Sequence, residues 1–263
     1  MFGVSQISLK ATRSTDPLGC VVVLPGRGLS GRFMMNFCNH MCLSRSHYAV
    51  LRPRNYTWYA MPRNSLDQAK TVATLPESLE SAEAAIKTVQ AAFGLSREKV
   101  ALFGFSAGGV MVTQLVIRSE TPYAAAVCMG GAIFEPAAVP PAKNKTPIIV
   151  QHNRLDECFD WHERYLPMKD ALASQGYAVE FQERPYGGHS FYTEDAVNVG
   201  GRLADQVTLG DAGSKRRVRD LDDPFSFGDN DGHIGRHAWF EFQIIVADAN
   251  DGRVRHDVLR RRG

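Results

Sequence analysis

The sequence predicts an α/β protein in which helices flank a mostly parallel central sheet. Short, wholly apolar runs such as residues 20–24 (CVVVL) are typical of strands that are buried on both faces. These runs alternate with longer segments of helical periodicity over about 190 residues, which is the pattern of a parallel sheet. The length of 263 residues and the apolar fraction of 44% suit one domain with a sizeable core.

The first predicted elements are a strand, a second strand and a helix. Residues 20–24 form the first strand, which ends abruptly at the turn residues 25–28 (PGRG). Residues 48–51 form a second, shorter strand. Apolar residues recur at helical spacing over residues 75–93, and Pro76 is compatible with a first helical turn there.

The later elements follow from the same two patterns, apolar runs for strands and helical spacing for helices. They are a strand at 100–103, a helix at 107–118, strands at 124–129 and 147–151, a helix at 161–174 and a strand at 178–184.

The composition changes after residue 196. Residues 197–263 are rich in Asp, Arg and Gly, and 239–246 is their one convincing strand-like run. We therefore expect a main domain at residues 1–196 and an atypical C-terminal extension at residues 197–263. A closing helix over 196–207 is conceivable, but two adjacent glycines at 200–201 disfavour it.

Charge and motif content argue against several classes of partner. The formal net charge of +2 indicates no polyanionic partner, so we expect no nucleic acid, and the basic runs 215–217 and 260–262 are typical of solvated surface. Residues 229–232 (DNDG) resemble the start of a calcium loop, but no glutamate closes it at the required spacing. We expect neither a metal nor an organic cofactor.

The N-terminus and the cysteines indicate the compartment. Residues 1–17 contain no apolar core of a signal peptide, and no window approaches the ~18 apolar residues of a membrane span. The five cysteines are an odd number without framework spacing, so we expect buried free thiols. A cytoplasmic protein is predicted. Its oligomeric state, monomer or homodimer, is left open.

The segment GFSAG at residues 104–108 matches the pattern G-x-S-x-G. It lies between a predicted strand and a predicted helix, the context in which this pattern forms a sharp turn that exposes a nucleophilic serine. The flanking glycines permit that turn, and the helix N-terminus favours developing negative charge. Ser106 is the predicted nucleophile.

A nucleophilic serine needs a base, and the base needs a carboxylate to orient it. His189 follows the last predicted strand, and the two glycines before it allow a loop that carries the imidazole over the end of the sheet. Asp156 follows the strand at 147–151 and is the predicted carboxylate, with Asp160 as the fallback and Glu157 as a weaker choice. The order serine, aspartate, histidine is the one expected of this arrangement.

An acyl-transfer reaction also needs two donors for the oxyanion. We expect the backbone N–H of Ala107, which follows the nucleophile, and that of Arg27 in the loop after the first predicted strand. A plain tight turn is the alternative for the Arg27 loop.

The chain resembles the phospholipase/carboxylesterase family of small α/β-hydrolases, which includes acyl-protein thioesterase-like esterases, over residues 18–195. Residues 100–109 (VALFGFSAGG) resemble the strand and elbow of that family, and residues 24–28 (LPGRG) resemble its L-H-G-x-G loop with Pro25 in place of histidine. Residues 152–159 resemble H-G-x-x-D-x-x-V, with Asn153 in place of glycine, Phe159 in place of valine and Asp156 at the acid position. The pair Gly188-His189 matches the final G-H.

The resemblance implies an α/β-hydrolase fold and a serine hydrolase of short- to medium-chain acyl esters that needs no cofactor. It also points to residues 52–62 as a loop after a strand, in which Trp58, Tyr59 and Met61 either line an acyl pocket or pack in the core. A thioesterase or peptidase would use the same machinery, and a non-catalytic binding protein on the same fold is a further alternative.

Overall fold

The computed structural model describes residues 2–60, 68–208 and 241–244. Within these residues the central sheet has eight strands. They are β1 (Val4–Lys10), β2 (Gly19–Leu24), β3 (Ser46–Pro53), β4 (Val100–Phe105), β5 (Ala125–Met129), β6 (Ile148–Asn153), β7 (Val179–Arg184) and β8 (Glu241–Ile244).

The strand order across the sheet is β7-β6-β5-β4-β2-β3-β1-β8. The strands from β7 to β3 pair in parallel, whereas β1 pairs antiparallel with β3 on one side and with β8 on the other. The prediction of a mostly parallel sheet is therefore confirmed. Because parallel strands share one direction, the loops after β2, β4, β6 and β7 lie along the same edge of the sheet.

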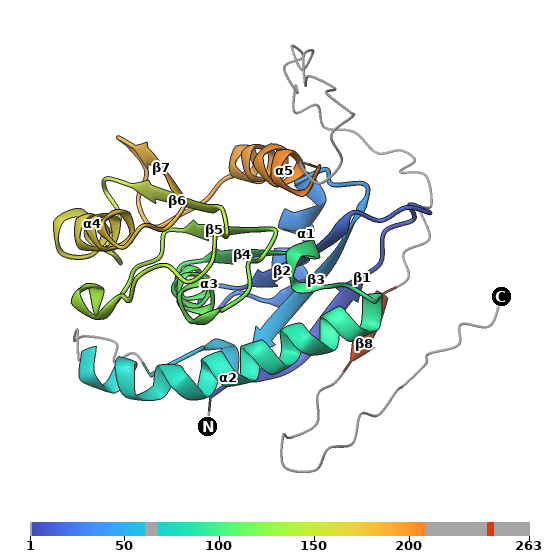
Figure 1. The fold of residues 1–263 in the computed structure, drawn as a ribbon, viewed down its shortest axis with the longest axis horizontal. Coiled ribbons are helices and arrows are strands. Elements are labelled where there is room, and N and C mark those ends of the chain that lie inside the picture. Colours follow the sequence, from blue (N-terminus) through green and yellow to red (C-terminus); the bar gives the residue numbers. More distant parts are fainter. Residues whose placement is uncertain (1, 61–67, 209–240, 245–263) are drawn as a thin grey trace, which may run out of the picture.

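Helices cover both faces of the sheet (Figure 1). They are α1 (Gly31–His40), α2 (Gln68–Phe93), α3 (Ala107–Arg118), α4 (Leu166–Ser174) and α5 (Thr193–Thr208). One face carries α1 and α5, and the other carries α2, α3 and α4. Central strands are buried on both sides: Val22 packs into one hydrophobic cluster and Val23 into the other, and both are fully buried.

Two elements were not predicted. In β1 only Val4, Ile7 and Leu9 are apolar, and all three are buried; the other positions are polar, as befits a strand near the edge of the sheet. Helix α1 begins at an N-cap, where Ser30 Oγ accepts from the backbone N–H of Phe33 at 3.1 Å. Its buried residues lie three and four positions apart, so a helical signal was present in the sequence.

Helix α2 begins earlier than predicted. The structure describes it from Gln68, which puts Pro76 inside the helix and not in its first turn. The additional turns are tied to the preceding loop, because Thr71 Oγ1 donates to the Ala60 carbonyl at 2.8 Å and the Ala60 N–H donates to Thr74 Oγ1 at 2.9 Å. Such long-range side-chain bonds are invisible to periodicity.

The segment predicted as one helix at 161–174 has two parts. Residues Trp161–Tyr165 form a π-helical turn, and α4 follows. Asp160 begins the turn by accepting from the N–H groups of His162 and Glu163. Pro167 has no N–H to donate, and α4 accommodates it near its start.

The closing helix exists despite its two glycines. A Cβ at Gly200 would lie 2.0 Å from the carbonyl oxygen of Met41, so α5 approaches the end of α1 too closely for any larger residue. Val199 and Leu203 are buried in the core. The predicted domain boundary at 196/197 falls inside this helix. Most of residues 197–263 lie outside the described residues, so the division into two regions stays a prediction.

The predicted strand at 239–246 is present as β8, over Glu241–Ile244. The basic runs 215–217 and 260–262 and the turn 229–232 lie outside the described residues. None of the helices in the described residues is both long and apolar enough to cross a membrane. All five cysteines are free, as predicted, but only Cys20, Cys38 and Cys128 are buried, whereas Cys42 and Cys158 are exposed.

Candidate active site

Ser106 stands at the junction of β4 and α3 in a strained backbone conformation. Its φ of 55° and ψ of −122° lie in a region that residues other than glycine rarely occupy. The junction is held on both sides, because the Ser106 N–H donates to the Met129 carbonyl at 2.9 Å and the Ser106 carbonyl accepts from the Val110 N–H at 3.1 Å. The strain turns the serine side chain out of the sheet.

The two glycines of the motif are required by close backbone approaches. A Cβ at Gly104 would lie 2.2 Å from the carbonyl oxygen of Gly108, and a Cβ at Gly108 would lie 1.8 Å from that of Leu24. Neither position can therefore accept a side chain while the helix packs against the sheet.

His189 connects the serine to Asp156. Its Nε2 lies 2.7 Å from Ser106 Oγ, and its Nδ1 lies 2.8 Å from Asp156 Oδ2. Phe105 and Phe159 contact the imidazole, with ring centroids 5.0 Å and 5.7 Å away. The three residues predicted from strand-end positions thus form one continuous hydrogen-bonded chain of side chains.

The surroundings of Asp156 favour its ionised form. Its side chain is only 1% exposed, and burial by itself would raise the pKa of the carboxyl group. Hydrogen bonds from His189 and from the backbone N–H groups of Phe159 and Cys158, both at 2.8 Å, outweigh this effect. The net result is a pKa below the ordinary aspartate value, so the carboxylate faces the imidazole with its negative charge.

The two alternative carboxylates have other contacts. Asp160 caps the following π-helical turn, as described above. Glu157 Oε2 accepts from the backbone N–H of His189 at 2.8 Å, and Asn153 Nδ2 donates to the Gly188 carbonyl at 2.8 Å. Glu157 and Asn153 thus hold the histidine loop, a function that was not predicted. The signal was Asn153 itself, which stands where the resembled family has glycine.

The predicted oxyanion donors lie on the two backbone segments beside Ser106. Ala107 is the first residue of α3, where a backbone N–H has no intrahelical partner. In the loop after β2, a Cβ at Gly26 would lie 3.2 Å from Ser106 Cβ, so this loop passes directly beside Ser106. The indole Nε1 of Trp58 fixes the loop by donating to the Pro25 carbonyl at 2.8 Å. The Arg27 side chain is exposed, and the donor role of its N–H stays a prediction.

The predicted pocket residues are deeply placed. Trp58 and Tyr59 are buried in the larger hydrophobic cluster, and the Tyr59 hydroxyl has no hydrogen-bond partner among the described residues. Met61 lies outside the described residues. Core packing therefore accounts for Trp58 and Tyr59, and contact with an acyl chain stays a prediction for all three.

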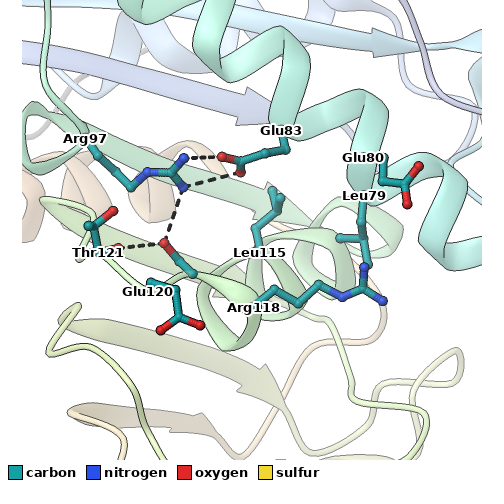
Figure 2. A pocket seen from close by; sticks show the side chains of 9 residues that line it. Leu79, Glu80, Glu83, Arg97, Leu115, Arg118, Glu120 and Thr121 are labelled. Atoms are coloured by element: carbon teal, nitrogen blue, oxygen red, sulfur yellow. Dashed lines mark hydrogen bonds and ion pairs between the residues drawn. The ribbon is translucent and has the colours of Figure 1, made fainter.

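A pocket of about 350 Å³ lies elsewhere, between α2 and α3 (Figure 2). It is lined by Leu79 and Glu83 of α2, by Leu115 and Arg118 of α3, and by Arg97, whose guanidinium points at the Glu83 carboxylate. Arg118 ends α3, whereas Ser106 precedes its first residue, and a helix of 12 residues spans about 18 Å. This pocket is therefore separate from the candidate active site.

Residues 13–199 match the phospholipase/carboxylesterase family. The fold is similar to that of esterase PE8, with a TM-score of 0.67 and 17% identity over 78% of this chain and 98% of that one. It is also similar to SOBER1 from Arabidopsis thaliana (TM-score 0.59, 19% identity, 72% and 99% covered) and to a phospholipase/carboxylesterase from Dyadobacter fermentans (0.62, 19%, 78% and 99%). No curated protein sequence gives a significant match. At these identities the structural likeness establishes the fold.

Proposed function

The chain belongs to the phospholipase/carboxylesterase family of α/β-hydrolases, and from this premise we propose that it is a serine esterase that hydrolyses short- to medium-chain acyl esters through Ser106. The observation that carries the proposal is the chain of hydrogen bonds from Ser106 Oγ through His189 to Asp156, at 2.7 Å and 2.8 Å. Such distances are within the range in which a base can take a proton from its neighbour.

The first step is acylation. His189 Nε2 takes the Ser106 proton as Oγ attacks the ester carbonyl, and the carbonyl oxygen becomes an oxyanion between the N–H groups of Ala107 and Arg27. Asp156 keeps the proton on Nδ1 and stabilises the imidazolium. When the tetrahedral intermediate collapses, the imidazolium gives its proton to the leaving alcohol, and the acyl group stays on Oγ.

Deacylation repeats these transfers with water. His189 takes a proton from a water molecule, the hydroxide attacks the acyl carbonyl, and the protonated imidazole returns its proton to Ser106 as the carboxylic acid leaves. Every proton transfer in both steps is to or from the His189 imidazole. The proposal accordingly includes no metal or organic cofactor, and its partner is a small acyl ester.

We propose the cytoplasm as its location. The five free cysteines support a reducing compartment, because thiols of secreted proteins are usually oxidised to disulfides.

A series of p-nitrophenyl esters, from acetate to long acyl chains, tests the proposed reaction. We expect hydrolysis by the wild type to peak at short or medium chains and to fall by at least about 10³-fold in Ser106→Ala. Ser190→Ala is the matched control, since Ser190 lies on the histidine loop and its hydroxyl contacts Tyr192 and not the triad. Equal rates in wild type and Ser106→Ala would overturn the proposal, and faster cleavage of thioesters at equal acyl length would change the substrate class to thioesters.

A further inference from the structure

Cys158 is an exposed thiol beside the triad, and the proposed mechanism does not use it. It is the second residue after Asp156, whose Oδ1 accepts from the Cys158 N–H at 2.8 Å. One potential metal-ligand atom each from Asp156, Cys158 and His189 lie within 4.8 Å of one another. The cluster therefore combines a thiol, an imidazole and a carboxylate, which are the three ligand types that Zn²⁺ prefers.

The spacing suits a tetrahedral ion after a small adjustment. Zn²⁺ binds such ligands at about 2.0–2.3 Å, which puts neighbouring ligand atoms about 3.3–3.7 Å apart. The side chains would have to close by about 1 Å, and Cys158 is exposed and can move. The carboxylates of Asp156 and Glu157 lie on the same loop beside Cys158 and His189, an arrangement that favours a cation.

We propose that Cys158, His189 and Asp156 form an inhibitory site for thiophilic divalent cations, of which Zn²⁺ is the type. The cation bonds to Cys158 Sγ, whose proton leaves to the solvent, and to a ring nitrogen of His189 and a carboxylate oxygen of Asp156. No electron is transferred. The proposal rests on the proposed esterase function only for its consequence, the loss of activity.

Binding of the cation to either ring nitrogen of His189 stops the reaction. A cation on Nε2 occupies the lone pair that takes the Ser106 proton. A cation on Nδ1 takes the lone pair there, so the imidazole proton moves to Nε2, which then cannot accept the proton of Ser106. Removal of the ion restores the triad, so the inhibition is reversible.

The test titrates ZnCl₂ into wild type, Cys158→Ser and Cys42→Ser while p-nitrophenyl acetate hydrolysis is followed in a non-chelating buffer. Cys42→Ser is the matched control because Cys42 is the other exposed cysteine. We expect wild type and Cys42→Ser to be inhibited alike, with full recovery in excess EDTA. In Cys158→Ser, half-inhibition should need at least about tenfold more zinc, since loss of a ligand costs at least as much as loss of a supporting contact. Equal sensitivity of wild type and Cys158→Ser would overturn the proposal.

A second readout does not depend on activity. Cd²⁺ added to wild type should produce an ultraviolet cadmium–thiolate band that is absent in Cys158→Ser and weakened in His189→Ala. Absence of the band in wild type, or an equal band in Cys158→Ser, contradicts the site. The two proposals can fail separately. If the wild type hydrolyses no ester when it is metal-free but forms the band when Cd²⁺ is added, the esterase proposal is refuted and the metal site is supported.

Discussion

At the scale of single residues, the candidate site combines strain with restraint. The left-handed backbone of Ser106 costs about 1–3 kcal/mol, an amount that the surrounding packing must offset. The residues around it are restrained by hydrogen bonds: Asp156 accepts from two backbone N–H groups, and Glu157 accepts from the backbone N–H of His189. We infer that this rigidity keeps the three polar side chains aligned before a substrate arrives.

The carboxylate should be essential for turnover although it never touches substrate. We expect Asp156→Asn to lower kcat for p-nitrophenyl acetate by roughly 10³–10⁴-fold, because an amide favours the wrong imidazole tautomer. Asp160→Asn is the control, since Asp160 caps a helical turn. Steady-state kinetics of both variants test this expectation. A larger loss of kcat in Asp160→Asn than in Asp156→Asn would show that the catalytic carboxylate is Asp160.

Burial of His152 should make stability depend on pH. Burial lowers the pKa of this imidazole, whose Nε2 is 2.8 Å from the Phe159 carbonyl oxygen. In an unfolded chain histidine titrates near pH 6.5, so below about that pH the unfolded state holds a proton that the folded state lacks. The stability that comes from keeping His152 neutral is fully present above about pH 6.5. It is lost as the pH falls toward the lowered pKa of His152 in the folded protein.

Urea unfolding at about pH 7.5 and about pH 5.5 measures this effect. The free energy of unfolding should fall more between the two values in wild type than in His152→Gln, which keeps an N–H donor but does not titrate. An equal fall in both proteins would show that the pH dependence comes from other groups.

Single site residues could be predicted where they directly follow a predicted strand. Ser106, Asp156 and His189 each follow a predicted strand, and the structure brings their side chains together because parallel strands end at one edge. Asn153 and Glu157 act through loop conformation, which leaves no periodic signal in the sequence. For that reason their contacts with the histidine loop were not foreseen.

At the scale of elements, α5 is joined to the sheet by one buried carboxylate. Asp195 is fully buried, accepts from Gln151 Nε2 at 2.9 Å and forms an ion pair with Arg184. Its second oxygen accepts from the Tyr192 N–H at 2.6 Å, which caps the start of α5. Asp195 thus ties the helix after the histidine loop to both β6 and β7.

Loss of this carboxylate should destabilise the fold. We expect Asp195→Ala to lower the free energy of unfolding by about 3 kcal/mol, because it leaves the Arg184 charge and the Gln151 amide unpaired. Glu194→Ala, on the neighbouring exposed position, should change it by no more than about 0.5 kcal/mol. Guanidinium unfolding of the two variants gives the comparison, and similar effects would contradict the assigned role.

Elements were predictable where an apolar pattern was unbroken. The runs at β2, β4 and β5 are wholly buried, and each was placed to within two residues. Helix α5 was disfavoured because of Gly200. The structure shows that this glycine allows the helix backbone to approach Met41 closely, a contact that no local sequence pattern reveals. The early start of α2 likewise depends on hydrogen bonds between the Ala60 backbone and the side chains of Thr71 and Thr74.

At the scale of the whole molecule, the alternation of strands and helices was enough to predict the sheet, since crossover connections between parallel strands follow few topologies. The edge of the sheet was not predictable. β1 is a half-polar strand, and its outer partner β8 comes from the far end of the chain. Pairing over such a sequence separation has no local signature.

Truncation separates the contribution of the C-terminal region from that of the catalytic machinery. A chain that ends at residue 208 keeps all of α5, and we expect it to retain wild-type kcat/KM but to lose solubility, because the edge of β1 loses its β8 partner. A chain that ends at residue 199 also loses the buried Leu203 and should unfold at lower temperature. Loss of activity in the folded 208-residue chain would place part of the active site in the extension.

Covalent labelling tests the central claim, that Ser106 is the nucleophile activated by His189, most directly. The protein is treated with a fluorophosphonate, digested, and its peptides are analysed by mass spectrometry. We expect one adduct per chain on Ser106, formed far more slowly in His189→Ala. An adduct on another residue, or labelling of Ser106 at an unchanged rate in His189→Ala, would contradict it.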